Sequence, residues 1–159
     1  MKKYVLICLI VFIVIGGTAS VLYLIKSISK VGVHGTLYIN EKIITDKYVN
    51  IHQKYAEIPL IEVLQNSGFD IVWVDDTTAE AIYQGEKYII DLKEKSFLRE
   101  GKNDNLITPT PGGNTFSCKI VESNIILDSN TVKSIMFRIG RNLSVIVDYS
   151  KSEVYINIY

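Results

Sequence analysis

Hydrophobic residues recur along this chain with two periods, and residues 57–76 (EIPLIEVLQNSGFDIVWVDD) show both within one short stretch. Four apolar residues follow Pro59 at a spacing that predicts one buried face of a short helix. Pro59 suits the first turn of that helix, where its missing N–H costs nothing. Gly68 supplies the left-handed conformation that ends a helix. The apolar run that follows then predicts a strand, with Ile71 and Trp73 on one face and Val72 and Val74 on the other.

The residues after this strand predict two further strands joined by polar turns. Asp75 and the three residues after it favour a turn, because aspartate and threonine side chains bond to their own backbone. Residues 79–84 (AEAIYQ) and 85–92 (GEKYIIDL) then form a second and a third strand, with a turn between them. Trp73, the chain's single tryptophan, shares a face of the first strand with Ile71. We therefore predict that Trp73 packs between the sheet and the helix.

A second stretch, residues 129–159, repeats this order of signals. Ser129 or Asn130 suits the cap of a helix, because a short polar side chain accepts hydrogen bonds from the free N–H groups there. Four apolar residues at helical spacing lie on one face, namely Val132, Ile135, Met136 and Ile139. Gly140 ends this helix, and a strand, a turn and another strand follow. The sequence thus contains two helix–glycine–strand–turn–strand units.

The first 30 residues differ from the rest of the chain. Residues 4–25 carry no charged side chain, and at about 1.5 Å per residue they reach about 33 Å, enough to cross a hydrocarbon core of about 30 Å. A cleaved secretion signal ending near Ala19 or Ser20 is the alternative, but the apolar run continues where a mature chain normally turns polar. We predict an uncleaved transmembrane anchor in residues 1–30. Its N-terminus would lie inside the cell and residues 31–159 outside the cell membrane.

Charge is distributed unevenly along the chain. Residues 1–30 hold four lysines and no acidic residue, so residues 31–159 hold the other 13 basic residues and all 17 acidic ones, a net charge of −4. Affinity for nucleic acid depends largely on neutralising phosphates, and an acidic domain supplies little of it. The two cysteines, Cys8 and Cys118, cannot form a disulfide within residues 31–159. The predicted partners are the cytoplasmic membrane, through residues 4–25, and an envelope protein or cell-wall polymer, with no nucleic acid.

Few residues carry the patterns of catalysis or metal binding. His34 and His52 are the only histidines, too few for a three-histidine copper site, and we interpret them as surface or edge-strand residues. Asp75, Asp76 and Glu80 form one carboxylate cluster, which would suit a calcium site or a glycosidase-like acid pair. The cluster coincides with a predicted turn and lacks EF-hand spacing, which favours a structural role. No catalytic residue, metal or cofactor is therefore predicted.

Residues 99–115 (REGKNDNLITPTPGGNT) separate the two units. They combine turn-forming residues, a TPTP segment that favours extended geometry and a flexible GGN segment. We interpret them as an exposed connector. A loop that binds a partner is the alternative, because loops on a rigid scaffold often carry binding residues.

The first unit and the residues before it follow a recognisable order: a short LYIN hairpin, an extended IPL entry into a helix, a glycine and an IVWVD strand. The residues that carry this order are Tyr38, Ile39, Asn40, Ile58, Pro59, Leu60, Gly68, Ile71, Trp73 and Asp75. In this order the chain resembles the copper amine oxidase-like N-terminal domain, or stalk domain, a family common on cell-surface proteins of Gram-positive, spore-forming bacteria. The resemblance covers residues 33–92 well and residues 125–159 loosely. It departs from the family at Ile61 and Glu62, where the family usually has an arginine soon after its proline, and the second unit lacks both the proline and the tryptophan.

The resemblance implies an accessory domain, because in amine oxidases the copper and the tyrosine-derived cofactor belong to a separate catalytic domain. The sequence predicts an α+β fold in which antiparallel strands pack on two short helices. The structural residues would be Pro59, Gly68, Trp73 and Gly140. We expect a non-catalytic, membrane-anchored extracytoplasmic stalk or binding module of the bacterial cell envelope. The alternatives are an envelope-polymer hydrolase that uses Asp75 or Glu80, and a membrane-anchored regulator of envelope or sporulation enzymes.

Overall fold

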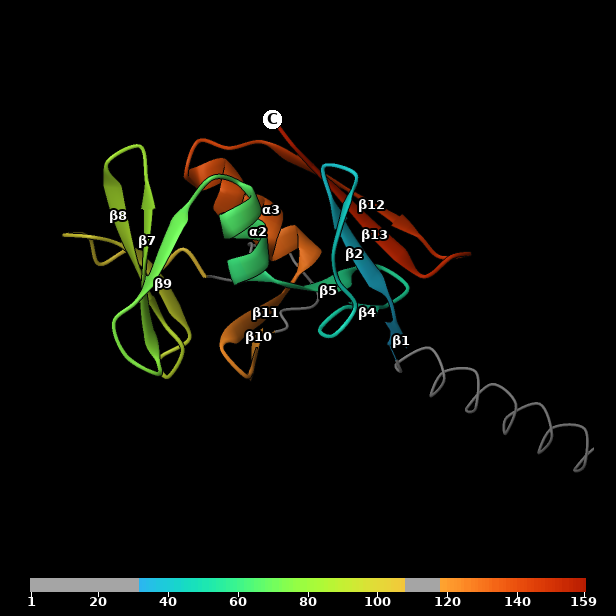
Figure 1. Ribbon diagram of the computed structural model, residues 1–159, viewed down its shortest axis with the longest axis horizontal. Helices are drawn as coiled ribbons and strands as arrows, with labels where there is room; N and C mark the ends of the chain where they lie inside the picture. The colour runs from blue at the N-terminus through green and yellow to red at the C-terminus, as the bar shows by residue number, and fades with distance from the viewer. Residues whose placement is uncertain (1–31, 108–117) are drawn as a thin grey trace, which may run out of the picture. The chain divides into compact units, whose positions relative to one another are not determined.

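The computed structural model describes residues 32–107 and 118–159 (Figure 1). The predicted anchor at residues 4–25 lies outside the described residues, as does part of the predicted connector. The chain divides into two units, Met1–Gly32 and Val33–Tyr159, and the strands and helices named below belong to the second. Within the described residues, no helix is both long and apolar enough to cross a membrane.

The described strands form three sheets, of which the central sheet has the order β1–β4–β5–β11–β10 (Figure 1). Its strands are β1 (Val33–His34), β4 (Asn50–Ile51), β5 (Ala56–Pro59), β10 (Cys118–Val121) and β11 (Asn124–Asp128). β5 and β11 pair antiparallel in the middle, with Leu127 opposite Ile58. Each of these two strands leads directly into a helix. β5 continues into α2 (Leu60–Asn66), and β11 continues into α3 (Ser129–Arg138).

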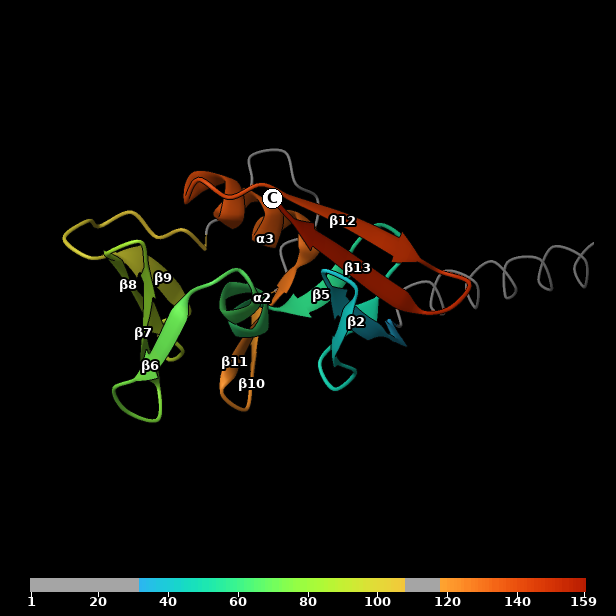
Figure 2. The ribbon, with the colours of Figure 1, turned by 45° about the horizontal axis from the view of Figure 1, so that its top comes forward.

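Of the other two sheets, one follows α2, and the other joins the two strands after α3 to two strands from before α2 (Figure 2). The meander sheet is antiparallel throughout, and its strands in spatial order are β6 (Asp70–Trp73), β7 (Thr78–Tyr83), β8 (Glu86–Asp91) and β9 (Ser96–Arg99). The mixed sheet has, in spatial order, β12 (Leu143–Asp148), β13 (Glu153–Ile158), β2 (Thr36–Ile39) and β3 (Lys42–Thr45). The fold is α+β. The two repeated units predicted from the sequence are present as α2–β6–β7 and α3–β12–β13.

The pairing of β2 with β13 departs from the predicted antiparallel sheet, because these two strands run parallel. Tyr38 lies opposite Tyr155, and their rings stack with centroids 4.8 Å apart. The Tyr38 hydroxyl also donates to Glu153 Oε1 at 3.1 Å. Period-two alternation gives the same face pattern whichever way a neighbouring strand runs, so the sequence pattern alone does not fix the direction.

Left-handed glycines end both helices, which confirms the prediction for Gly68 and Gly140. Their φ angles are 90° and 78°. In each case the N–H of the residue after the glycine donates to the carbonyl five residues earlier, at 3.1 Å after α2 and 2.8 Å after α3. This is the Schellman arrangement, which satisfies carbonyls that the helix leaves without partners.

The starts of both helices differ from the predicted ones. Pro59 is the last residue of β5 and the N-cap of α2, with φ −76° and ψ 121°, so it lies just before the first turn. The cap of α3 is Asp128 and not Ser129 or Asn130. Asp128 Oδ1 accepts the N–H of Asn130 at 3.1 Å and the N–H of Thr131 at 3.0 Å. A carboxylate at this position satisfies two free N–H groups and lies favourably at the positive end of the helix dipole.

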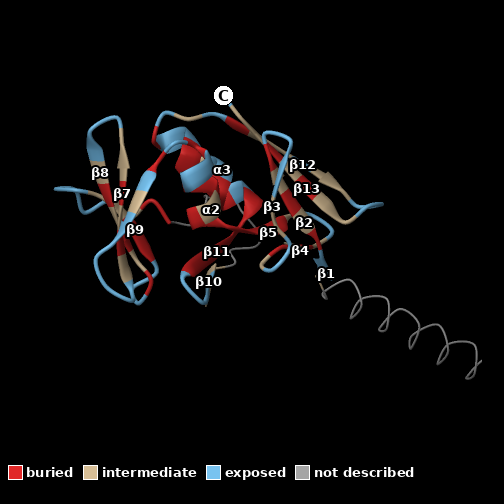
Figure 3. Cartoon of the chain, in the orientation of Figure 1, coloured by how far each residue is buried: buried red, intermediate tan, exposed pale blue. Residues whose placement is uncertain are grey.

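The hydrophobic core joins both helices to all three sheets (Figure 3). The largest fully buried side chains are Tyr88, Phe97, Leu37, Ile39, Ile58, Leu60, Leu64, Ile90, Ile125, Ile126, Leu127 and Ile135. Burying one such side chain contributes about 1.5–3 kcal/mol to the free energy of unfolding. The sheets and helices of residues 33–159 are therefore held together by a shared core without a disulfide.

Trp73 lies outside this core, so its predicted packing role is wrong. It belongs to β6, an edge strand of the meander sheet, and 40% of its surface is exposed. Phe69, which follows the glycine after α2, takes the buried position instead and is 4% exposed. Its ring stacks on Tyr83 with centroids 4.6 Å apart. An edge strand has a neighbour on one side only, so the space beside Trp73 stays open to solvent.

Candidate functional site

The predicted carboxylate cluster is divided between two local structures. Asp75 closes the β6–β7 turn, where its Oδ1 accepts the N–H of Thr77 at 2.7 Å and the N–H of Thr78 at 2.8 Å. The bond from the Thr77 N–H is the main cause that lowers the pKa of Asp75. Glu80 instead forms an ion pair with Lys87 on the neighbouring strand, at 2.5 Å. Asp75 and Glu80 thus each have a structural partner. Nowhere in the described part of the chain do three His, Cys, Asp or Glu side chains lie where they could hold a metal.

The two predicted surface histidines have different environments. His34 is exposed in the edge strand β1, as predicted. His52 is largely buried, which the sequence did not indicate, and its side chain is 15% exposed. Its ring stacks on Tyr55 with centroids 4.5 Å apart, and its Nε2 lies 3.7 Å from Glu57 Oε1. Because Glu57 also bonds the Lys119 amine at 2.6 Å, His52 belongs to a polar cluster of the central sheet.

The free edge of the meander sheet exposes a run of apolar side chains. Among the described strands, β6 pairs with β7 alone, so the backbone groups on its other side have no strand partner. Val72, Trp73 and Val74 are 50%, 40% and 59% exposed. The exposed residues Asp70 and Asp76 flank them. We call these five residues the β6 edge.

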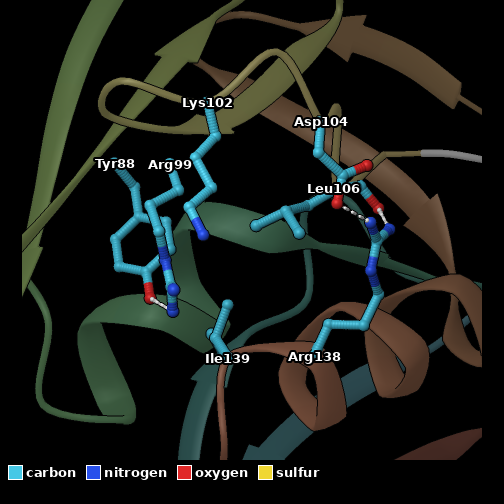
Figure 4. Close-up of a pocket in the computed structure, with 7 residues that line it drawn as sticks. All are labelled: Tyr88, Arg99, Lys102, Asp104, Leu106, Arg138 and Ile139. Carbon is cyan, nitrogen blue, oxygen red and sulfur yellow. Dashed lines mark hydrogen bonds and ion pairs between the residues drawn. The ribbon is translucent and has the colours of Figure 1, made fainter.

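A second candidate site is a cleft of about 220 Å³ formed by β8, β9, the loop after β9 and the end of α3 (Figure 4). It is lined by Tyr88, Arg99, Lys102, Asp104, Leu106, Arg138 and Ile139. Three of these side chains are cationic and one is a carboxylate. We call this site the basic cleft.

The loop that forms one wall of the basic cleft is fixed at both ends. Arg138, in the last turn of α3, bonds Asp104 Oδ2 through Nη2 at 2.5 Å and the Leu106 carbonyl through Nη1 at 3.3 Å. Asn105 Oδ1 accepts the N–H of Phe97 at 3.1 Å, which ties the loop to β9. The side chains of this wall are therefore held in place by both α3 and the meander sheet.

The predicted exposed connector, residues 99–115, is exposed only in part. Leu106 and Ile107 are 7% and 5% exposed and belong to the hydrophobic core. The connector therefore includes an anchored stretch that contributes to the basic cleft. Residues 108–115 lie outside the described residues.

The opposite wall of the basic cleft is a chain of hydrogen bonds. Arg99 Nη2 donates to Glu86 Oε2 at 2.7 Å and to the Tyr88 hydroxyl oxygen at 3.2 Å. The Tyr88 hydroxyl donates to Glu86 Oε2 at 2.7 Å. Burial, followed by the bond to Glu86, raises the pKa of Tyr88, so its hydroxyl remains a donor at neutral pH. Lys102 extends between the two walls, and none of the described carboxylates lies within ion-pair distance of it (Figure 4).

The sequence analysis did not single out the residues of the basic cleft. Arg99 and Lys102 belong to residues 99–115, for which a binding loop was the alternative to an exposed connector. That alternative is the one feature of the sequence that pointed towards this site. Tyr88 lies in a predicted strand and Arg138 in a predicted helix, and neither belongs to a motif that indicates binding. They come together only because the meander sheet and α3 share one core.

The two candidate sites differ in chemistry: the β6 edge is apolar with acidic flanks, and the basic cleft carries Arg99, Lys102 and Arg138. Comparison with known proteins gave no match to a protein-family model, to a curated protein or to a solved structure. Function is therefore inferred from the surfaces of the chain itself.

Proposed function

We propose that the chain is a non-catalytic binding module, held at the outer face of the cytoplasmic membrane by residues 4–25, which docks a component of the cell envelope on the β6 edge. The observation that carries this proposal is the exposure of Val72, Trp73 and Val74 on a strand with a free side. Contiguous apolar surface that is exposed and bordered by polar residues is typical of interaction sites. The resemblance to stalk domains of bacterial surface proteins agrees with this role.

The contacts of the acidic residues support binding rather than hydrolysis. A glycosidase-like mechanism needs two carboxylates on opposite sides of the bond to be broken. Asp75 accepts hydrogen bonds from the N–H groups of its own turn, and Glu80 forms an ion pair with Lys87. Both side chains have a role in local structure that explains their presence.

The β6 edge has the chemistry of a site for an extended chain segment. The free N–H and C=O groups of an edge strand can form hydrogen bonds with an added strand. Contacts with every second side chain of the added strand then determine which sequences bind. Val72 and Val74 project to one face of the sheet and Trp73 to the other. Asp70 and Asp76 attract lysine or arginine at the ends of the incoming segment and repel a second copy of β6, which carries the same aspartates. The ligand we propose is an extended segment with apolar residues between basic ends.

Trp73 provides a direct test, because it is the chain's only tryptophan and reports on its own surface. The experiment uses the full chain in non-ionic detergent and an N-acetylated peptide amide of sequence KVTVTVK. Burial of the half-exposed indole by the peptide should shift its emission to shorter wavelength and saturate. The peptide EVTVTVE, with the same apolar residues and acidic ends, should leave the emission unchanged.

Matched variants separate the β6 edge from general charge effects. The double variant Asp70→Asn, Asp76→Asn should weaken binding of KVTVTVK about two- to thirtyfold, since exposed ion pairs contribute about 0.2–1 kcal/mol each. Asp46→Asn, an exposed aspartate outside the β6 edge, should have no effect. Equal binding of the basic and acidic peptides, or no saturable shift with either, would contradict the proposed ligand.

A further inference from the structure

We propose that the basic cleft binds a small organic carboxylate that carries an apolar group, the chemistry found at the C-terminus of a peptide. This site is separate from the β6 edge, because β6 and β9 are opposite edges of the meander sheet. The proposal therefore does not depend on the docking function described above.

The cations of the basic cleft are presented by a fixed turn. The Lys102 N–H donates to the Arg99 carbonyl at 3.0 Å, so the two cationic residues share one turn. Arg138 holds the next part of the loop through Asp104 and the Leu106 carbonyl. A site whose groups are already positioned loses less conformational entropy when a ligand binds.

Charge in the basic cleft is unbalanced by one unit. Arg99, Lys102 and Arg138 supply three positive charges, and their carboxylate neighbours Glu86 and Asp104 supply two negative ones, which leaves +1. The unpaired cation is Lys102. This excess matches one carboxylate, whereas a phosphate dianion would leave the cleft with a net negative charge.

Hydrogen-bond donors remain available for such an anion. The bonds of Arg99 to Glu86 and Tyr88 both use Nη2, and within the described residues its Nη1 and Nε have no partner. Arg99 Nη1 can donate to one oxygen of a carboxylate, and the Lys102 amine, which carries three donors, can donate to the other. Together they can satisfy both oxygens of one carboxylate.

The rest of the basic cleft is apolar and small. Leu106, Ile139 and the ring of Tyr88 line it beside the cations (Figure 4). Its volume of about 220 Å³ lies below the range of about 300–1,000 Å³ typical of sites for drug-sized ligands. The cleft therefore suits a carboxylate with one apolar group of side-chain size.

The probe for this site is N-acetylleucine, titrated into the full chain in non-ionic detergent and followed through the backbone amide signals of residues 100–106 in NMR spectra. Saturable shifts are expected for Lys102 and for Leu106. N-acetylleucinamide has the same apolar group without the charge and should produce no saturable shift. Inorganic phosphate should bind more weakly than N-acetylleucine.

Lys102→Met keeps the length of the side chain and removes its charge. It should weaken binding of N-acetylleucine about tenfold, the lower end for loss of a charged hydrogen-bond partner. Because Lys102 is exposed, this variant should unfold like the parent. The matched control is Lys133→Met, an exposed lysine on α3 that does not line the cleft, and it should bind like the parent.

Three results would overturn the proposal: no saturable shift with N-acetylleucine, equal affinity for its neutral amide, or unchanged affinity in Lys102→Met. Tighter binding of phosphate would also overturn it. A second arm identifies the source of the carboxylate by comparing N-acetylleucine with an N-acetylated tetrapeptide that ends in leucine. Tighter binding of the peptide supports a chain end as the ligand, and equal binding supports a free small carboxylate.

Discussion

Trp73 and Phe69 lie four residues apart and have opposite environments. Phe69 enters the core directly after the glycine that ends α2, and its ring lies against Tyr83. Trp73 follows on the edge strand β6, where 40% of it remains exposed. The size of a side chain favours burial, but its position at the edge of a sheet decides how much burial is available.

Truncation of these two aromatic residues should therefore have unequal effects. Phe69→Ala should lower the free energy of unfolding by about 3–5 kcal/mol, as removal of a buried aromatic ring does. Trp73→Ala should lower it by about 1 kcal/mol, because much of the indole is already in solvent. Denaturation followed by circular dichroism measures both. Losses of equal size would contradict the assignment of Trp73 to the surface.

The cap of α3 gives a second prediction at the residue scale. Asp128→Ala should lower the free energy of unfolding by about 0.5–2 kcal/mol, because two helix N–H groups lose their acceptor. Asn130→Ala, which removes an exposed side chain that does not cap the helix, should change it by less than about 0.5 kcal/mol. The same denaturation experiment compares the two variants. A larger loss for Asn130→Ala would contradict the cap at Asp128 and support Asn130, one of the two caps that the sequence suggested.

The repeat extends beyond the helices to the turns of the two hairpins. Asp75 accepts N–H groups two and three residues later in the β6–β7 turn. Asp148 does the same with Ser150 and Lys151 in the β12–β13 turn, at 3.0 Å and 3.2 Å. Both aspartates thus begin the turn that joins the two strands of their hairpin. This position gives Asp75 a structural role in place of the catalytic one considered from the sequence.

The two turn aspartates should make stability depend on pH in the acid range. The pKa of Asp75 is lowered mainly by the Thr77 N–H, and the pKa of Asp148 mainly by the Ser150 hydroxyl. A carboxylate with a lowered pKa in the folded state stabilises the fold above its unfolded pKa, 3.8 here. That contribution is lost as the pH falls through the folded pKa.

Asp75→Asn and Asp148→Asn test this dependence, because the amide oxygen still accepts the N–H groups but carries no charge to titrate. Each variant should lose less stability than the parent when the pH falls from 5 towards 2. Thermal unfolding measured across this range gives the slope. Asp46→Asn, which removes a carboxylate that closes no such turn, serves as the control. Parallel curves for the parent and both turn variants would contradict the assignment.

At the scale of the whole molecule, the sequence predicted those features of the fold that depend on residues close together in the chain. The α+β class, the two helices with their terminal glycines and the two hairpins after them follow from local spacing. The pairing of β2 with β13 and of β5 with β11 could not be predicted in this way. Each pair joins segments far apart in the chain, and the alternation of apolar residues in one strand does not identify the strand beside it. The basic cleft was missed for the same reason, since it combines residues from two strands, a loop and a distant helix.

The membrane anchor remains a prediction from the apolar run at residues 4–25. If it is uncleaved, the mature chain should retain these residues and stay in the membrane fraction after washing with high salt. N-terminal sequencing of the mature chain provides the decisive observation. A chain that begins near Ser20 would show that the segment is a secretion signal and that residues 31–159 are not tethered by it.

The proposed function requires that the β6 edge binds an extended segment as an added strand. Hydrogen exchange of the full chain, with and without KVTVTVK, tests it most directly. At a peptide concentration of about ten times its Kd, the amides of β6 that face away from β7 should exchange about tenfold more slowly, while amides of the basic cleft should not change. Unchanged exchange in β6, or protection confined to other strands, would contradict the claim.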